Sequence, residues 1–131
     1  MKKYFGTDGI RGIIGKKLTP KIAYSLGVAL TEKIYRPKIV VGRDTRYSGE
    51  TFLYAFVSGV LAGGGTVVNC GITSTPSISY LTRNLDFDFG LVISASHNPA
   101  EYNGLKLFDS NGHKLSNEKE IQLEHLFCQK T

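Results

Sequence analysis

Cysteine is scarce in this sequence of 131 residues, and long apolar runs are absent from it. The two cysteines, Cys70 and Cys128, form neither a metal-ligand spacing nor a disulfide framework, so we expect two reduced thiols in a cytoplasmic protein. No apolar run approaches the roughly 20 residues of a membrane-spanning helix. The opening residues carry two lysines with no apolar stretch behind them, so we expect no signal peptide and no membrane partner.

Basic residues exceed acidic ones, 16 against 11, which gives a net charge of +5. Such an excess suits either nucleic acid or a small phosphorylated ligand. No basic stripe alternates with aromatic residues, as it does in proteins that bind single strands. Cations instead sit beside glycine, serine and aspartate in loop-like segments, at Arg11, Arg43, Arg46 and Lys106. We therefore expect a small anionic ligand and no nucleic acid.

Strand and helix patterns alternate along the chain, without a linker or an internal repeat. Strands are expected at residues 4–5, 39–41, 66–68, 91–93 and 105–108, and helices begin near residues 19, 48, 75 and 117. This alternation predicts a three-layer α/β sandwich, with a mixed, mostly parallel sheet and helices on both faces. A hairpin turn at residues 111–112 predicts one antiparallel strand.

Polar caps mark the predicted helix starts. Thr19 followed by Pro20 is a typical first turn, and Ser48 can cap the next helix. Asn117 and Glu120 have the spacing of a capping box. Ligands in α/β sheets gather at the carboxyl ends of strands, and three unusual loops of this sequence follow strands. We therefore expect these loops to converge on one site.

The strongest of the three is the segment 94–99 (SASHNP), which follows the apolar strand at 91–93. It presents hydroxyls on a tight turn, with His97 inside the turn and Lys106 shortly after it. A serine that carries a phosphoryl group needs an exposed position and cationic neighbours, and this segment offers both. Lys106 alternates with leucines in a strand, so it faces either solvent or the cleft.

An alternative is that Ser94, Ser96 and Asn98 only form the turn. The occurrence of six specified residues together after an apolar strand favours the functional interpretation. Between the two serines, we expect Ser96 to face the cleft and Ser94 to support the loop. His97 either takes part in proton transfer or binds phosphate and holds the loop.

The second segment, residues 5–12 (FGTDGIRG), is rich in glycine, which lets backbone N–H groups approach an anion. Thr7 and Asp8 lie in it, and Arg11 can hold a phosphate through its fork of donors. The alternative is a glycine-rich turn with a solvated arginine.

The third segment, residues 42–49 (GRDTRYSG), places two arginines around Asp44 at the entry to a helix, whose N-terminus favours anions. Arg43 is therefore a candidate phosphate ligand. The alternative is a purely structural pair between Arg43 and Asp44.

These three segments, in this order and spacing, resemble the α-D-phosphohexomutase superfamily, and the similarity extends from residue 5 to about residue 126. Ala95, between the two serines, and the form of the opening segment are similar to the phosphoglucosamine mutase branch. The segment 100–104 (AEYNG) lacks the acidic residue that this branch usually has directly before Asn-Gly. Residues 102–104 are closer to the phosphomannomutase/phosphoglucomutase branch. Both sugars therefore stay open at this point.

The resemblance implies that Ser96 is a phosphoserine that passes its phosphoryl group to the sugar, so that glucosamine 6-phosphate and glucosamine 1-phosphate interconvert. The phosphate on Ser96 would also be a ligand of Mg²⁺. Lys106 and His97 would assist proton transfer or bind phosphate, and Arg11 would steady the serine loop. The candidate phosphate-binding residues are Thr7, Asp8, Arg11, Arg43, Asn98 and Lys106.

Members of this superfamily have four domains, and the later ones supply a metal loop, the sugar-reading element and the site of the non-reacting phosphate. None of those motifs occurs in this sequence. The resemblance therefore implies that residues 1–131 form the phosphoserine-bearing N-terminal domain, inactive alone. Its partners would be a phosphorylated hexose or hexosamine and the missing C-terminal domains. The alternative is a standalone binding or interaction module that reuses the fold.

Overall fold

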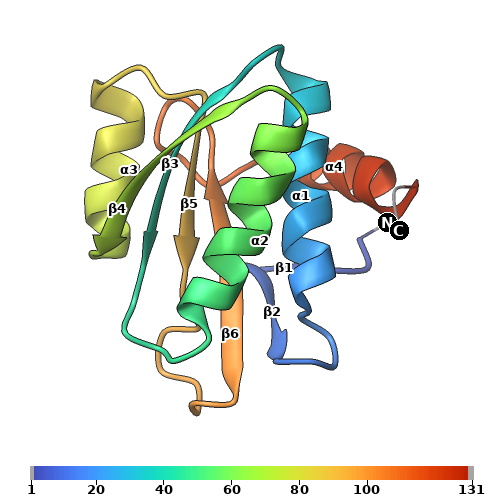
Figure 1. Cartoon of the computed structure of the whole chain (residues 1–131), viewed down its shortest axis with the longest axis vertical. Helices are drawn as coiled ribbons and strands as arrows, with labels where there is room; N and C mark the ends of the chain where they lie inside the picture. Colours follow the sequence, from blue (N-terminus) through green and yellow to red (C-terminus); the bar gives the residue numbers. More distant parts are fainter. Residues whose placement is uncertain (1, 130–131) are drawn as a thin grey trace.

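The computed structural model describes residues 2–129, in which six strands and four helices are found (Figure 1). The strands are β1 (Phe5–Gly6), β2 (Gly9–Ile13), β3 (Lys38–Arg43), β4 (Thr66–Ile72), β5 (Phe89–Ile93) and β6 (Tyr102–Phe108). The helices are α1 (Pro20–Lys33), α2 (Gly49–Ala62), α3 (Thr75–Asn84) and α4 (Asn117–Gln129). None of these described helices is long and apolar enough to span a bilayer.

All six strands form one sheet in the order β1-β2-β6-β5-β3-β4. The predicted α/β fold with a mixed sheet is confirmed, but the parallel part is smaller than expected. Only β4, β3 and β5 run parallel, whereas the pairs β5–β6, β6–β2 and β2–β1 are antiparallel. The cause is the connection from β5 to β6, which is too short for a helical crossover and so returns the chain in the opposite direction.

Two segments differ from the sequence-based expectation. The stretch expected as a glycine-rich loop contains β2, which pairs with β6 through Arg11 opposite Gly104. The turn at residues 111–112 leads only to an isolated bridge between Phe108 and Lys114, and not to a further strand. The antiparallel strand expected near this turn is β6 itself, which returns along β5.

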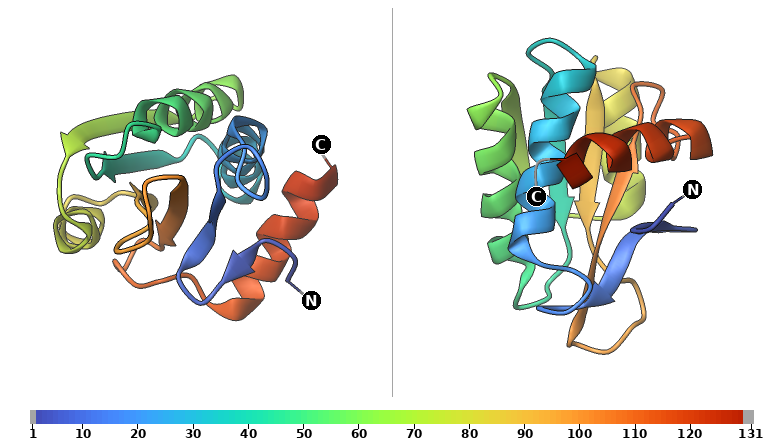
Figure 2. Two further views of the ribbon diagram at one scale, coloured as in Figure 1. Left: turned by 90° about the horizontal axis from the view of Figure 1, so that it is seen from below. Right: turned by 90° about the vertical axis from the view of Figure 1, so that its right-hand side faces the viewer.

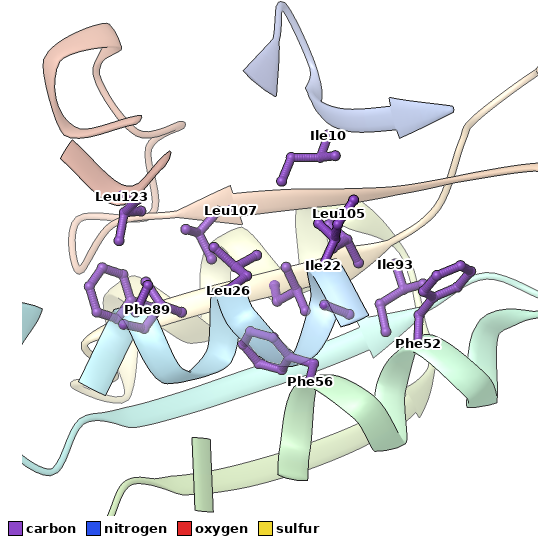
Figure 3. Packing of buried hydrophobic residues seen from close by; sticks show 14 of the residues in the cluster. Ile10, Ile22, Leu26, Phe52, Phe56, Phe89, Ile93, Leu105, Leu107 and Leu123 are labelled. Carbon is purple, nitrogen blue, oxygen red and sulfur yellow. The ribbon is translucent and has the colours of Figure 1, made fainter. Parts of the chain in front are cut away.

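The helices cover both faces of the sheet, as predicted (Figure 2). Helices α1 and α2 pack on one face, and α3 packs on the other. The larger core lies under α1 and α2, where Leu105 and Leu107 of β6 point towards Ile22 and Leu26 of α1 (Figure 3). The smaller core surrounds Ile78 of α3. The residue between the two leucines, Lys106, therefore faces away from the larger core, as the alternation predicted.

The predicted side-chain cap is confirmed at Thr19, whereas Ser48 stands at the cap position without capping the helix. Thr19 is the N-cap of α1, and its hydroxyl accepts a hydrogen bond from the backbone N–H of Ile22 at 3.3 Å. Ser48 occupies the N-cap position of α2 but makes no capping hydrogen bond. Its buried hydroxyl accepts instead from the side-chain amide of Asn103 at 2.8 Å, so it ties α2 to β6.

The predicted capping box of α4 is wrong. The carboxylate of Glu120 is buried and binds Lys2 at 2.9 Å and Lys114 at 3.0 Å, so it does not reach back to the helix start. The hydroxyl of Ser116 accepts a hydrogen bond from the first turn of α4 instead. The carboxylate of Glu120 therefore binds the ammonium groups of Lys2 and Lys114 and not a backbone N–H at the start of the helix.

Helix α4 also binds the start of the chain. The buried carboxylate of Glu124 accepts hydrogen bonds from the backbone N–H groups of Lys3, Tyr4 and Phe5, at 2.6, 3.0 and 2.7 Å. Of these amides, that of Phe5 belongs to β1, which is an edge strand of the sheet, and the other two directly precede it. Strand β1 is thus held by a side chain of the last helix.

Candidate active site

The loop between β5 and β6, residues 94–101, carries both candidate serines. It lies beside the loop that follows β3, at the lower end of the sheet in Figure 1. Ser96 is exposed and has a φ of +58°, in the left-handed region that non-glycine residues seldom adopt. Such a conformation persists only where the surroundings hold it, and it concentrates at functional sites. The unusual backbone of Ser96 therefore marks this loop.

Three of the predicted site residues line one cavity of about 260 Å³: Arg11 from β2, Ser96 from the loop and Lys106 from β6. Its walls are completed by Ser94, Val92 and Thr75. Two cations and three hydroxyl groups thus surround one space, and none of the lining residues is acidic. This composition suits a phosphorylated anion.

Arg11 has a buried hydrogen-bond donor. Its Nε is buried and has no hydrogen-bond partner among the described residues. A buried donor without an acceptor costs about 1–3 kcal/mol, and the cost is higher on a charged group. Arg11 also lines the serine cavity, so its charge lies beside the space in which an anion would bind.

Thr7 and Asp8 form the exposed turn between β1 and β2. They line a second cavity of about 250 Å³ with Lys17 and Arg11, and they do not line the serine cavity. Arg11 therefore lies between the two cavities, and the opening segment reaches the serine only through this residue.

Arg43 is not among the residues that line the serine cavity. Its Nη2 lies 3.5 Å from a carboxylate oxygen of Glu50, and its Nη1 donates to the backbone carbonyl of Asp44 at 3.3 Å. The carboxylate of Asp44 pairs with Arg46 instead, at 3.2 Å. The alternative of an Arg43–Asp44 ion pair is therefore wrong in its partner, because Arg46 is two positions further along a turn that folds back on Asp44.

The residue that holds the serine loop is Arg46, which was not among the candidate site residues. Its Nη2 donates to the carbonyls of Ser96 and Asn98, at 2.8 and 2.9 Å. Its Nη1 donates to the carbonyls of Pro99 and Tyr102, at 2.8 and 3.2 Å. Arg46 thus holds this loop directly, and the role of Arg11 in steadying it stays a prediction.

The other residues of the serine loop have distinct positions. His97 is exposed and lies outside the set that lines the cavity. Asn98 donates its backbone N–H to the carbonyl of Ala95 at 3.1 Å and so closes the turn. Ser94 donates its hydroxyl to Asp44 and accepts from the backbone N–H of the next serine, which is the supporting position predicted for it.

Thr75 is a cavity residue that sequence reasoning missed. It is the first residue of α3, a helix of ten residues capped by the hydroxyl of Ser74. The helix N-terminus contributes a partial positive charge at this wall of the cavity. The helix start was recognisable from the Thr75-Pro76 pair, but only the fold brings it beside the loop of Ser96.

The cavity does not by itself form a magnesium site. Among residues 2–129 no group of three or more His, Cys, Asp or Glu side chains is placed to hold a metal ion. Asp44, which contacts the serine loop, has its carboxylate engaged by Ser94 and Arg46. An octahedral shell of oxygen ligands therefore requires groups beyond these side chains.

The fold and the cavity define the class of protein: an α/β/α domain with an exposed serine beside a cavity that Arg11 and Lys106 also line. The chain belongs to the phosphoglucomutase/phosphomannomutase family, because residues 2–131 match the sequence model of the family described as "Phosphoglucomutase/phosphomannomutase, alpha/beta/alpha domain I". The resemblance seen in the three sequence segments is thereby confirmed.

Several relatives of known name are similar to the chain over nearly its whole length. A phosphoglucosamine mutase of Clostridium kluyveri is 51% identical over 130 residues, which cover 96% of this chain and 29% of the relative. A phosphoglucosamine mutase of Staphylococcus saprophyticus is 48% identical over 135 residues, 98% of this chain and 30% of the relative. The chain thus spans less than a third of the length of these relatives.

Solved structures agree with this assignment of the fold. The crystal structure of a putative phosphomannomutase from Thermus thermophilus superposes with a TM-score of 0.83 at 33% identity, over 97% of this chain and 30% of that chain. A phosphoglucomutase/phosphomannomutase family protein from Burkholderia thailandensis has the same TM-score at 29% identity, with the same coverage.

Proposed function

We propose that this chain is the N-terminal domain of a phosphoglucosamine mutase, in which Ser96 carries the phosphoryl group. The observation that carries the proposal is the cavity that the exposed Ser96 lines together with Lys106 and Arg11. The names of the relatives at about half identity support glucosamine 6-phosphate and glucosamine 1-phosphate as the substrate pair.

The chemistry follows from these positions. The bond between Ser96 Oγ and phosphorus breaks and a bond from a sugar hydroxyl to phosphorus forms. The sugar hydroxyl loses its proton to a base, and the released Ser96 Oγ takes up a proton to become a hydroxyl. The resulting bisphosphorylated sugar returns its other phosphate to Ser96. Arg11, Lys106 and the N-terminus of α3 stabilise the negative charge on the transferred group by fixed electrostatics.

Proton transfer is assigned to Lys106 or His97. Lys106 lines the cavity and is therefore in reach of a sugar hydroxyl placed there. His97 is adjacent to Ser96 but outside the cavity wall, so Lys106 is the better placed of the two. The phosphate on Ser96 would be one ligand of Mg²⁺, which when bound neutralises charge on the phosphoryl group.

The remaining ligands and the sugar contacts are assigned to the parts that the relatives have beyond this length. The partners of this domain are thus a phosphorylated hexosamine and the further domains of the same enzyme. A second candidate substrate is a mannose or glucose phosphate, favoured by the segment 102–104 and by the name of the Thermus thermophilus structure. Competition between the three sugar phosphates in the complete enzyme distinguishes these candidates.

The test compares two serines in the full-length enzyme. Ser96→Ala is expected to abolish turnover because the covalent carrier is lost, whereas Ser94→Ala loses two supporting hydrogen bonds, worth about 1 kcal/mol each, and keeps a measurable part of the activity. Phosphopeptide mass spectrometry locates the phosphate independently. Phosphate on Ser94 and not on Ser96, together with an active Ser96→Ala enzyme, contradicts the proposal.

A further inference from the structure

We propose that Arg46 is a positioning residue, which holds Ser96 in its left-handed conformation and does not itself bind the substrate's phosphate. The inference concerns how the serine is presented. Its consequence for turnover rests on the function proposed above, but its structural part does not. The starting point is the φ of +58° at Ser96, for which a β-carbon is a disadvantage.

The first step is that every N–H donor of the Arg46 guanidinium is already hydrogen-bonded. Its Nη atoms make four hydrogen bonds to backbone carbonyls of the serine loop, as described above. Its Nε donates to Asp44 Oδ2 at 3.2 Å. A guanidinium has five N–H donors, so none is left for an anion. Arg46 thus differs from Arg11, whose Nε is without a partner among the described residues.

The second step is that Ser96 is held on both sides of its α-carbon. Its backbone carbonyl accepts from Arg46 Nη2 at 2.8 Å. Its backbone N–H donates to Ser94 Oγ at 3.0 Å, and that hydroxyl donates to Asp44 Oδ2 at 2.7 Å. Asp44 therefore joins the two restraints, because the same oxygen accepts from Arg46 Nε. Fixing the N–H and the C=O of one residue fixes its φ and ψ.

The third step concerns the type of side chain. The four carbonyls and the carboxylate around Arg46 match the planar fork of a guanidinium. A lysine would supply the same charge as a compact ammonium with three donors, so it cannot bridge all five acceptors. Arg46→Lys therefore keeps the charge of the loop and releases the backbone of Ser96.

The test measures strain at Ser96 by thermal unfolding of the 131-residue chain. Glycine adopts positive φ without a penalty and alanine does not, so Ser96→Gly should melt higher than Ser96→Ala, by about 3 °C. In the Arg46→Lys background this difference should vanish, because the relaxed loop no longer imposes a positive φ. Arg43→Lys, at the end of β3 and paired with Glu50, is the matched control and should retain the full difference.

The inference is overturned if the melting temperatures of Ser96→Gly and Ser96→Ala still differ fully in the Arg46→Lys background. It is also overturned if the Arg43→Lys background removes this difference to the same extent as Arg46→Lys. If Arg46→Lys does not fold, Ser94→Ala replaces it in the same comparison, since it removes the restraint on the other side of Ser96. The Ser94→Ala background should then reduce the difference, and a full difference there contradicts the inference.

The functional arm uses the full-length enzyme proposed above. Arg46→Lys should lower kcat by at least about tenfold and leave KM for the sugar phosphate within about twofold, because the serine is misplaced while the anion ligands remain. A rise in KM with unchanged kcat shows instead that Arg46 binds substrate, which contradicts the inference. The melting comparison needs no activity, so it remains decisive if the proposed function fails.

Discussion

Ser94 and Asp44 lie 50 positions apart in the sequence, yet the hydroxyl of Ser94 donates a 2.7 Å hydrogen bond to the carboxylate of Asp44. This contact joins the loop that follows β3 to the loop that follows β5. Both loops stand at the carboxyl ends of parallel neighbouring strands, which is why the fold brings them together. The candidate phosphoserine therefore depends on a residue from another strand of the sheet.

Asp44→Asn should lower the free energy of unfolding by about 2 kcal/mol. The amide offers one acceptor oxygen where the carboxylate offers two, and its NH₂ group faces the guanidinium of Arg46 or the hydroxyl of Ser94. Chemical denaturation of the chain measures the change. Asp86→Asn, at an exposed position with a positive φ that asparagine also accepts, is the control and should change stability little. Equal effects of the two substitutions would contradict the role of Asp44.

Gly104→Ala should destabilise the domain and disturb the cavity. A β-carbon at this position would lie 2.6 Å from the carbonyl oxygen of Ser94 and 2.8 Å from Cγ of Arg11, so strand and loop must separate. Gly6→Ala is the matched control within the same sheet, because its β-carbon would meet only a carbonyl oxygen at 3.7 Å. Thermal unfolding should show a loss of several degrees for Gly104→Ala and a small one for Gly6→Ala. The reverse order would show that the close approach at Gly104 is not rigid.

Arg11→Met should separate stability from ligand binding. The substitution removes a buried Nε that has no partner among the described residues, so the melting temperature should stay the same or rise. Binding of inorganic phosphate, followed by NMR shifts at Ser96 and Lys106, should weaken. Lys38→Met, at the opposite end of the sheet, controls for the lost charge. If it weakens phosphate binding equally, Arg11 acts only through net charge.

The 131-residue chain should show no mutase turnover with glucosamine 6-phosphate and Mg²⁺. Among the described residues, no carboxylate that could bind the metal lines its cavity. The chain also covers only 29% of one relative, so we assign the other parts of the site to the remaining length. A coupled assay, run beside the full-length Clostridium kluyveri relative, provides the comparison. Robust turnover by the chain, with contaminating full-length mutase excluded, would contradict the assignment of the missing roles to other domains.

Glu124→Gln should loosen β1 without unfolding the domain. The amide keeps one acceptor oxygen, but its NH₂ group faces backbone N–H donors that the carboxylate had bound. Hydrogen exchange at the amides of Tyr4 and Phe5 should become faster, whereas exchange in β5 should not change. Gln122→Ala, on the exposed side of α4, provides the control. Unchanged exchange at Tyr4 and Phe5 would show that the carboxylate is dispensable.

Much of this arrangement was predictable from the sequence because it depends on local patterns. The Thr19 cap, the α/β alternation and the orientation of Lys106 between two leucines follow from spacing alone. The serine segment was recognisable because its residues are contiguous. Strand β2 was not predicted, because its glycines hide the alternation by which strands are identified.

The role of Arg46 could not be predicted for a different physical reason. Its acceptors are backbone carbonyls, which every residue possesses, so they leave no trace in the choice of amino acids. The partners of Glu120 were missed because Lys2 lies 118 positions away, where no local rule applies. Pairings of that kind become visible only when the topology is known.

The hydrogen bonds of Glu124 impose an order on the folding of a chain that is synthesised from its N-terminus. The amide of Phe5 finds its acceptor 119 positions later, on α4. The hydrogen bonds that hold Ser96 join only residues between 44 and 102, so they can form before α4 is synthesised. Strand β1 is thus translated first and secured last, because its acceptor on α4 is synthesised after all the strands of the sheet.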